Sequence, residues 1–385
     1  MQKLTLQSKI LFSEFLSECI PIYALIPLMF AGYANMNAFQ VGSLLAVWQV
    51  LIVVFEIPTG VIADKFGRKY SLSIGKAVRL FCYPMWLFFP NYLGLLAGLL
   101  FLSLGDALIS GALEAYSYDE LPDKQSFNKL RQRTVAIHLA AFTTAGLISY
   151  ILNADYHLIL ITSILMSAIG FVASFLLPTD KIHQSHKYLT LLKDSKLEIK
   201  KNSNTLYLFI TTSAVLALLV IFIEQLNIFY KATGISDVIV ALLMTIGNFI
   251  TFLIFWVSHR IEKLMRDVQA LLLILFVSIL TLTVVIKLNA FIQIGMVFLF
   301  VRIVRLSVIN YSNDLHHAIS SKTRATVGSI SSFFGKILAS LTMLAIGYVG
   351  AHEIDIKLSI SVSGLLISST IYYLHILQRQ SRTLQ

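Results

Sequence analysis

The sequence contains twelve apolar runs of about 18–25 residues, the length that a helix needs to cross the hydrocarbon core of a bilayer. We therefore predict an all-α membrane protein with twelve transmembrane helices. Because backbone polar groups in lipid must bond within the protein, each run is expected to be helical. The runs cover residues 10–33, 40–63, 72–89, 93–116, 133–152, 157–178, 205–230, 235–258, 269–287, 291–311, 326–349 and 355–377.

Composition excludes several other classes of protein. Hydrophobic residues make up 57% of the chain and charged residues 13%, against about 25% charged in soluble domains. The net charge of +10 arises from bases in short loops between apolar runs, so we expect no nucleic-acid partner. Cys19 and Cys82 both lie in apolar runs and form no metal-ligand spacing. We expect no metal site, no cofactor and no enzymatic activity.

The distribution of basic residues predicts the orientation in the membrane. With the N-terminus inside, 22 of the 30 bases fall in cytoplasmic segments and five lie within spans. The external loops hold only Lys231, Lys287 and Lys357. Under the positive-inside rule this asymmetry places both termini in the cytoplasm, and we expect the cell membrane as the location.

The chain divides into two halves of similar length. We predict a six-helix half at residues 1–178, a basic, partly helical cytoplasmic linker at 179–204, and a second six-helix half at 205–385. The first and seventh spans begin about 195 residues apart. This offset maps the loop Asp64–Lys69 onto the loop His259–Asp267, which is also basic. Such weak internal symmetry is typical of transporters built from repeats.

The loop after the second span reads Gly60-Val-Ile-Ala-Asp64-Lys-Phe-Gly67-Arg68-Lys. It resembles the signature loop of the major facilitator superfamily. The resemblance implies the major facilitator fold, small-molecule transport by a monomer, and a cytoplasmic latch between the halves. Besides Gly60, Asp64, Gly67 and Arg68, the latch would include Asp119, at the cytoplasmic end of the fourth span. The glycines would allow a tight turn and close helix contact.

Further segments are similar to a bacterial, drug-efflux-like group within this superfamily. They are Glu56-Ile-Pro-Thr-Gly60, Ser110-Gly-Ala-Leu-Glu-Ala115 and Arg324-Ala-Thr326. The chain also departs from the drug–proton antiporters. Phe101 stands where they carry an arginine, and the fifth span has no proline. The resemblance therefore indicates the fold more strongly than it indicates drug export.

Ionisable residues inside a span are costly, so we treat each as a functional candidate. Polar residues of the fourth span recur at intervals of 3, 4, 4 and 3, which places them on one helical face. This stripe, predicted to line a central cavity or to join helices, comprises Ser103, Asp106, Ser110, Glu114 and Ser117.

Other spans carry acids and bases as well. Glu18 lies about 12 Å into the first span, whereas Glu14 is either a site residue or a solvated end residue. Glu224 in the seventh span faces either the cavity or the external rim. Arg302 and Arg305 in the tenth span predict either an ion pair with Asp106 or a site for an anionic or zwitterionic group.

A further charge pair is expected near the boundary between the halves. Glu56 in the second span has two candidate partners, Lys336 in the eleventh span and Arg79 in the third. Sequence alone leaves both pairings open.

Together these features predict a secondary active transporter that works by alternating access, with protons and a small-molecule substrate as partners and lipid around it. Proton-coupled export of a small amphipathic compound is the first hypothesis, with Glu18, Asp106, Glu114 or Glu224 carrying the proton. Alternatives are transport of a zwitterionic or anionic metabolite, siderophore-like or peptide-like, and a lipid-handling protein on the same fold. No nucleotide-binding loop is present, so ATP is not expected to drive transport.

Overall fold

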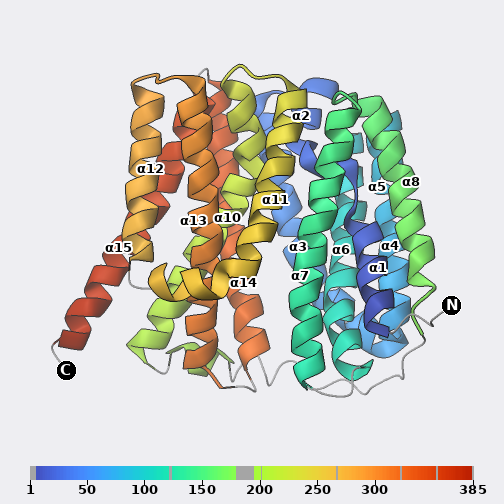
Figure 1. Ribbon diagram of the computed structural model, residues 1–385, viewed down its shortest axis with the longest axis horizontal. Helices are drawn as coiled ribbons and strands as arrows, with labels where there is room; N and C mark the ends of the chain where they lie inside the picture. The colour runs from blue at the N-terminus through green and yellow to red at the C-terminus, as the bar shows by residue number, and fades with distance from the viewer. Residues whose placement is uncertain are drawn as a thin grey trace. The chain divides into compact units, whose positions relative to one another are not determined.

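The computed structural model of the chain describes residues 6–120, 124–178, 195–200, 202–265, 268–320, 323–352 and 354–383, and these residues are mainly helical (Figure 1). The first part contains α1 (Leu6–Glu18), a 3₁₀ turn η1 (Pro21–Ala24), α2 (Ile26–Leu28), a π-helical turn η2 (Met29–Tyr33), α3 (Ala38–Phe66), α4 (Arg68–Leu80), α5 (Cys82–Phe88), α6 (Tyr92–Glu120), α7 (Lys124–Ile151) and α8 (Tyr156–Ser174). The second part contains α10 (Ser203–Ala232), α11 (Asp237–Met265), α12 (Gln269–Val285), α13 (Ala290–Ala318), α14 (Arg324–Ala351) and α15 (Ile356–Thr383). Residues 195–200 are also helical. Most of the predicted linker, 179–194, lies outside the described residues.

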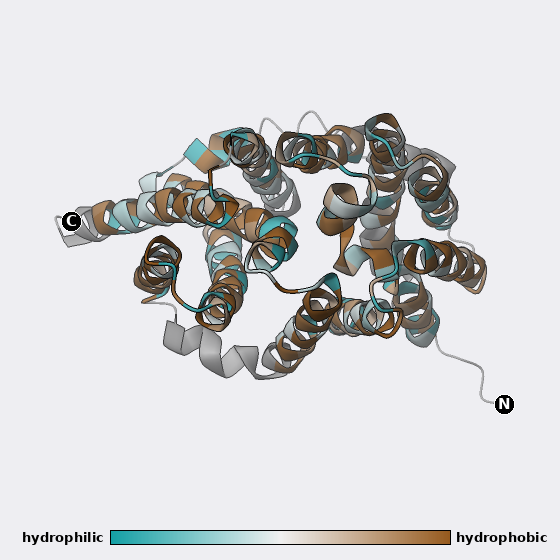
Figure 2. Cartoon of the chain, turned by 90° about the horizontal axis from the view of Figure 1, so that it is seen from above, coloured by the Kyte–Doolittle hydropathy of each residue, from teal (hydrophilic) through white to brown (hydrophobic). Residues whose placement is uncertain are grey.

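These elements account for all twelve predicted spans. Among the described residues, eight helices are long and apolar enough to cross a membrane, and the apolar stretches Asp237–Leu253 and Gln269–Val285 add two shorter ones. The first span is the broken segment from α1 to η2, and the third is α4 followed by α5. Eight, two and two make twelve. Hydrophobic residues dominate the helices when the chain is seen from above (Figure 2).

Prolines explain the two broken spans. α1 ends at Glu18, Ile20 is extended (φ −106°, ψ 108°), and Pro21 begins the 3₁₀ turn. In the third span the helix is interrupted at Phe81, and Pro84 lacks the N–H that would bond to the carbonyl of Leu80. Broken helices at membrane depth are tolerated where the freed backbone groups are buried in protein.

Helix α8 shows directly that lipid is the solvent of this fold. Its buried face carries small and polar residues, among them Ser163, Ser167 and Ser174. Its exposed face, with intervals of 3, 4, 4 and 3, is apolar: Leu158, Ile161, Leu165, Ile169 and Val172. A helix with polar residues inside and leucine-sized residues outside is the reverse of a soluble amphipathic helix. Such a helix is stable only with hydrocarbon around it.

Contacts between helices divide the chain into two compact units. The first unit comprises Met1–Ser185 with Ile235–Phe255, and the second comprises His186–Gly234 with Trp256–Gln385. The sequence assigned Ile235–Phe255 to the second half, so the boundaries of the halves stay a prediction. This segment contacts the first unit at Gly146 of α7, where an added Cβ would lie 2.5 Å from the Thr245 hydroxyl.

Each unit, taken by itself, has the same pattern of neighbouring helices. In the first unit α1 packs against α7 and α8, and in the second α10 packs against α14 and α15. Likewise α4 packs against α6 and α8, and α12 packs against α13 and α15. The helix pairs correspond in order along the chain. This correspondence is the structural counterpart of the sequence offset of about 195 residues.

The signature segment is mostly helix, which corrects the predicted loop. α3 continues to Phe66 and α4 begins at Arg68, so the turn consists of Gly67 alone, with φ 98°. Only glycine adopts this backbone conformation readily. The predicted counterpart loop at His259–Asp267 is also helical as far as Met265. The prediction of loops was wrong because charged residues were taken to mark the helix ends. In the structure the helices continue through these residues.

Candidate functional site

The polar face of α1 is the starting point of a buried charge network in the first unit. Ser13, Glu14 and Ser17 are buried to 0–2% exposure, and Glu18 ends the helix. Gly170 allows α8 to approach closely here, because a Cβ at that position would lie 2.8 Å from the Cα of Ser17. The backbones of α1 and α8 therefore pack directly, and the carboxylates point to other helices.

Glu14 forms the most buried ion pair of the described residues. Lys76 Nζ on α4 lies 3.1 Å from Glu14 Oε1, and the two side chains are 1% and 2% exposed. Lys76 also donates to the Ser13 hydroxyl at 2.8 Å. The second carboxylate oxygen lies 3.2 Å from His138 Nε2 of α7. Glu14 is thus an interior residue and not the solvated helix end that was one of the two expectations.

Arg79, one turn further along α4, joins three helices. Its Nη1 lies 2.8 Å from Glu18 Oε1 on α1 and 3.2 Å from Asp106 Oδ1 on α6. Its Nη2 donates to the carbonyl and to the hydroxyl of Ser17. The Arg79 side chain is 3% exposed, whereas Asp106 is 32% exposed. Asp106 is therefore the most exposed member of this group.

Close packing of α4 on α6 places Arg79 against Asp106. Gly75 and Gly105 face one another, and a Cβ on either would lie within 2.8 Å of the carbonyl oxygen of the other. Small residues let membrane helices approach to this distance. The approach sets the position of Arg79, whose Cβ lies 2.8 Å from a Cβ built on Gly105.

The network is unbalanced in charge. Glu14, Glu18 and Asp106 carry three negative charges when ionised, while Lys76 and Arg79 carry two positive charges. His138 adds a positive charge only when protonated. Buried charges are tolerated when paired, so a three-to-two ratio favours uptake of a proton by one member. The arrangement therefore suits proton exchange.

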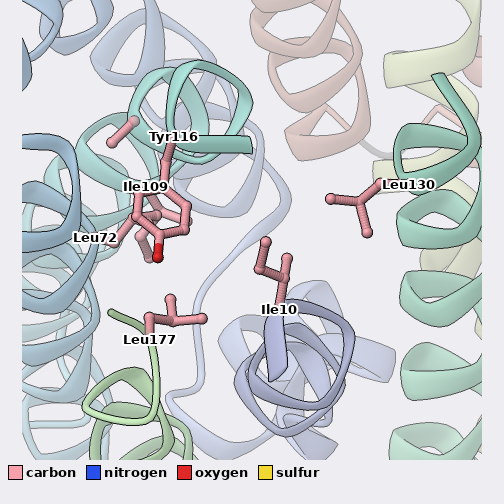
Figure 3. Close-up of a cluster of buried hydrophobic side chains, with 7 residues drawn as sticks. Ile10, Leu72, Ile109, Tyr116, Leu130 and Leu177 are labelled. Atoms are coloured by element: carbon pink, nitrogen blue, oxygen red, sulfur yellow. The ribbon is translucent and has the colours of Figure 1, made fainter. Parts of the chain in front are cut away.

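Apolar and aromatic side chains flank the network along the helices. Ile10 and Leu72 lie four residues before Glu14 and Lys76, in a buried cluster with Ala112, Tyr116 and other residues (Figure 3). Beyond Glu18, the hydroxyls of Tyr23 and Tyr83 lie 3.0 Å apart, and Phe142 contacts the Tyr23 ring. Apolar surroundings strengthen the charge interactions inside.

In the second unit, α13 carries a basic face near its middle. Phe298, Arg302 and Arg305 are spaced by four and three residues, and the Arg302 guanidinium lies 4.5 Å from the centre of the Phe298 ring. Arg302 is 8% exposed. The Nε atoms of both arginines are buried without a hydrogen-bond partner among the described residues. Glu224 on α10 is half-buried and forms no ion pair with a residue that the structure describes.

Some predicted residues stay without a structural test. The side chains of Asp64, Glu114 and Asp119 lie outside the described residues, as do those around Gly60, although the backbone there is helical. Within the fourth-span stripe, Ser103 is 0% exposed and Ser117 is 6% exposed, while Ser110 is exposed. The stripe therefore does not face one uniform environment.

The predicted charge pairs are resolved in part. Arg79, one of the two candidate partners of Glu56, contacts Glu18 and Asp106. Sequence left the pairing open because equal depth does not determine which helix face a side chain occupies. The pairs Glu56–Lys336 and Asp106–Arg302 join different units and stay predictions.

Sequence reasoning also missed Lys76 and His138 as site residues. Lys76 lies three residues before Arg79, so both belong to one face of α4, and this spacing was a usable signal. His138 offered a weaker signal, a single imidazole in the fifth span, 124 residues from its partner Glu14.

Comparison with known proteins identifies the family. A family model described as Major Facilitator Superfamily matches residues 10–352, and the chain belongs to that superfamily. It is 23% identical over 266 residues to YxaM of Bacillus subtilis (strain 168), an uncharacterized MFS-type transporter. That alignment spans 66% of this chain and 65% of the relative, slightly less than two thirds of its length.

Solved structures share the fold. The nucleoside transporter NupG superposes with a TM-score of 0.74 at 15% identity, over 97% of this chain and 98% of its own. A D-xylose-proton symporter gives 0.71 at 13% identity, over 95% of each chain. A POT family transporter in complex with 5-aminolevulinic acid gives 0.73 at 14% identity, also over 95% of each chain. These likenesses show the fold, and together with the family match and the apolar helices they make this chain a multi-pass membrane protein with the major facilitator fold, as the sequence predicts.

Proposed function

We propose that this protein is a proton-coupled secondary transporter that exports a small amphipathic compound by alternating access. The observation that carries the proposal is the shared guanidinium of Arg79, which two carboxylates, Glu18 and Asp106, contact from different helices. When one of the two carboxylates is protonated, Arg79 keeps a single ionised partner, and the positive and negative charges of the pair are equal. Asp106 is the proposed carrier because its side chain is 32% exposed, against 14% for Glu18.

Proton binding at Asp106 has a mechanical consequence in this geometry. When Asp106 is ionised, Arg79 of α4 bridges α1 and α6. When Asp106 is neutral, the bond to α6 weakens and Arg79 stays with Glu18 and Ser17 on α1. Charge-assisted bonds contribute roughly twice as much as neutral ones, so the proton shifts the balance between two helix contacts. Protonation of Asp106 is coupled in this way to movement of α6 relative to α1 and α4.

The surroundings of Asp106 also support an amphipathic substrate. Tyr83 follows Arg79, the partner of Asp106, by four residues, and its hydroxyl lies 3.0 Å from that of Tyr23. The rings of Tyr83 and Phe142 adjoin the Tyr23 ring. Ligand sites are typically aromatic with a few well-placed polar groups. The D-xylose-proton symporter with the same fold is named for proton coupling, which adds a precedent for the fold.

The experiment measures coupling apart from transport. Purified protein in proteoliposomes with an internal pH indicator is screened over amphipathic compounds for substrate-dependent proton movement. We expect Asp106→Asn to abolish accumulation driven by a pH gradient and to keep exchange of labelled substrate at equilibrium. Asp355→Asn, at an exposed carboxylate that caps α15, is the matched control and should behave as wild type. Gradient-driven accumulation in Asp106→Asn at the wild-type rate would refute the assignment.

A specific observation favours a second candidate, transport of an anionic or zwitterionic metabolite. Arg302 and Arg305 lie in the middle of α13, and their Nε atoms have no acceptor among the described residues. The two candidates are compatible, because an amphipathic compound can carry an anionic group.

A further inference from the structure

Within the described residues, no acid forms an ion pair with the basic face of α13, Arg302 and Arg305, although buried charges require a counter-charge. Arg302 lies 12 residues after Ala290 and 16 before Ala318, or about 18 and 24 Å from the two helix ends. Both arginines lie inside the predicted span 291–311. Burial of an ion without a partner is costly, so such residues persist where they serve a ligand or a pathway.

The part of the chain that the structure describes supplies no hydrogen-bond partner for the Nε atoms of Arg302 and Arg305. Arg302 is held against the Phe298 ring at 4.5 Å, a contact that engages the flat guanidinium and none of its N–H groups. Neither Arg302 nor Arg305 has a carboxylate within ion-pair distance in the described part of the chain. Glu224, the acid of α10, does not compensate them there.

The same face of α13 continues to Gly295, which is exposed. Gly295 precedes Phe298 by three residues and Arg302 by seven, so the helical period aligns all three with Arg305. A Cβ built on Gly295 meets no atom within 4 Å. Phe222 of α10 packs edge-to-face on Phe300 at 4.7 Å. Phe300 is two residues from both Phe298 and Arg302, so α10 packs against the opposite side of α13.

We propose that Arg302 and Arg305 bind the anionic group of the substrate, a carboxylate or a phosphate, with the body of the substrate beside Phe298. The inference rests on the proposed transport function and names the chemistry that the site accepts. Two guanidinium groups one helical turn apart provide forked donors that match both anions. The two positive charges of Arg302 and Arg305 repel a cation at the same place. Selectivity for anions over cations therefore comes from repulsion as well as attraction.

The test measures binding in the absence of a proton gradient. It uses four probes that share a phenyl ring on a two-carbon chain and differ in the charged or polar group at its end. Purified protein is titrated with tritiated 3-phenylpropionate, and phenethyl phosphate, phenethylammonium and phenethyl alcohol serve as competitors. We expect saturable binding that the phosphate displaces and that the ammonium and the alcohol do not. The relative potency of the carboxylate and the phosphate distinguishes the two anions. No saturable binding of either anion, or equal displacement by the alcohol, would overturn the proposal.

Variants connect the binding to the two arginines. Arg302→Gln and Arg305→Gln should each weaken binding of the anion by roughly tenfold or more, because each removes a charge-assisted contact. Arg302→Lys should lie between Arg302→Gln and wild type, since it keeps the charge and loses the fork. Arg133→Gln, at an exposed arginine of α7, is the matched control and should bind as wild type. Unchanged affinity in both glutamine variants would refute the site.

Failure of this inference is distinguishable from failure of the proposed function. Binding of the anionic probe is measured without a gradient, so the result does not depend on proton movement through Asp106. If the probes do not bind while a cationic compound shows Asp106-dependent proton movement, the anion site is wrong and the transport proposal stands. If the anion binds while no compound moves protons, the coupling proposal is wrong.

Discussion

Replacement of Lys76 by methionine tests whether the Glu14–Lys76 contact stabilises the first unit as a structural ion pair. Methionine is unbranched and close to lysine in length, so the substitution removes the charge with little change in packing. Glu14, at 2% exposure, keeps His138 at 3.2 Å as its remaining partner. The lost contacts are the ion pair at 3.1 Å and the bond to the Ser13 hydroxyl at 2.8 Å.

Removal of one partner from a buried ion pair costs about 3–5 kcal/mol, because it leaves the other charge uncompensated. We expect Lys76→Met to fall in the lower part of this range, since the imidazole of His138 still contacts the carboxylate. The double variant Glu14→Gln, Lys76→Met removes both charges. It should recover most of the lost free energy of unfolding.

The chain provides its own reporter for this measurement. Cys19 and Cys82 are 3% and 0% exposed and both belong to the first unit, so a fluorescent maleimide reaches them only when that unit opens. Where the first unit opens and closes faster than the maleimide reacts, the labelling rate is proportional to the population of the open form. Each 1.4 kcal/mol lost from the free energy of unfolding then speeds labelling about tenfold. Lys76→Met should therefore label roughly two to three powers of ten faster than wild type. Lys129→Met, at an exposed lysine of α7, is the control.

Two results would refute the reasoning. One is a labelling rate for Lys76→Met within a factor of about three of the Lys129→Met control. The other is a double variant that labels as fast as Lys76→Met, since the cost would then come from lost packing and not from an uncompensated carboxylate. If Lys76→Met fails to accumulate in the membrane, the double variant Glu14→Gln, Lys76→Met is compared with it. Normal accumulation of the folded double variant supports the uncompensated carboxylate as the cause, and its failure to accumulate contradicts it.

Gly75→Ala should lower the free energy of unfolding by about 1–3 kcal/mol in the same labelling assay, because its Cβ would lie 2.8 Å from a carbonyl oxygen of α6. Gly32→Ala is the control and should lower it little, because no atom lies within 4 Å of the added Cβ. Asp64→Asn should impair transport at normal membrane insertion if the signature segment acts as the cytoplasmic latch; a wild-type transport rate at matched expression would remove that role. A cysteine at Asn37 should react with an impermeant maleimide from outside intact cells, and one at Ser185 should react only after permeabilisation. Labelling of Ser185→Cys from outside would reverse the orientation.

Sequence determined the number and kind of helices because that information is local. The length of an apolar run decides whether it spans a bilayer, and lipid requires helical backbone, so twelve spans follow without knowledge of packing. Prolines mark the interruptions in the first and third spans, and Gly67 marks the signature turn. The candidate residues in spans, from Glu18 to Arg305, also follow from the sequence, since the cost of burying charge is a property of each residue.

Tertiary structure alone decided which charges meet. Lys76 and Glu14 are 62 residues apart, and His138 is 124 residues from the same carboxylate. The sequence places these residues at a depth along a helix, but it does not give the rotation of that helix or the identity of its neighbours. Close approach at Gly75 and Gly170 fixes both, and so Arg79 meets Glu18 and Asp106 and Glu14 becomes an interior residue. Contact between helices depends on packing over the whole unit, which is why no local pattern specifies it.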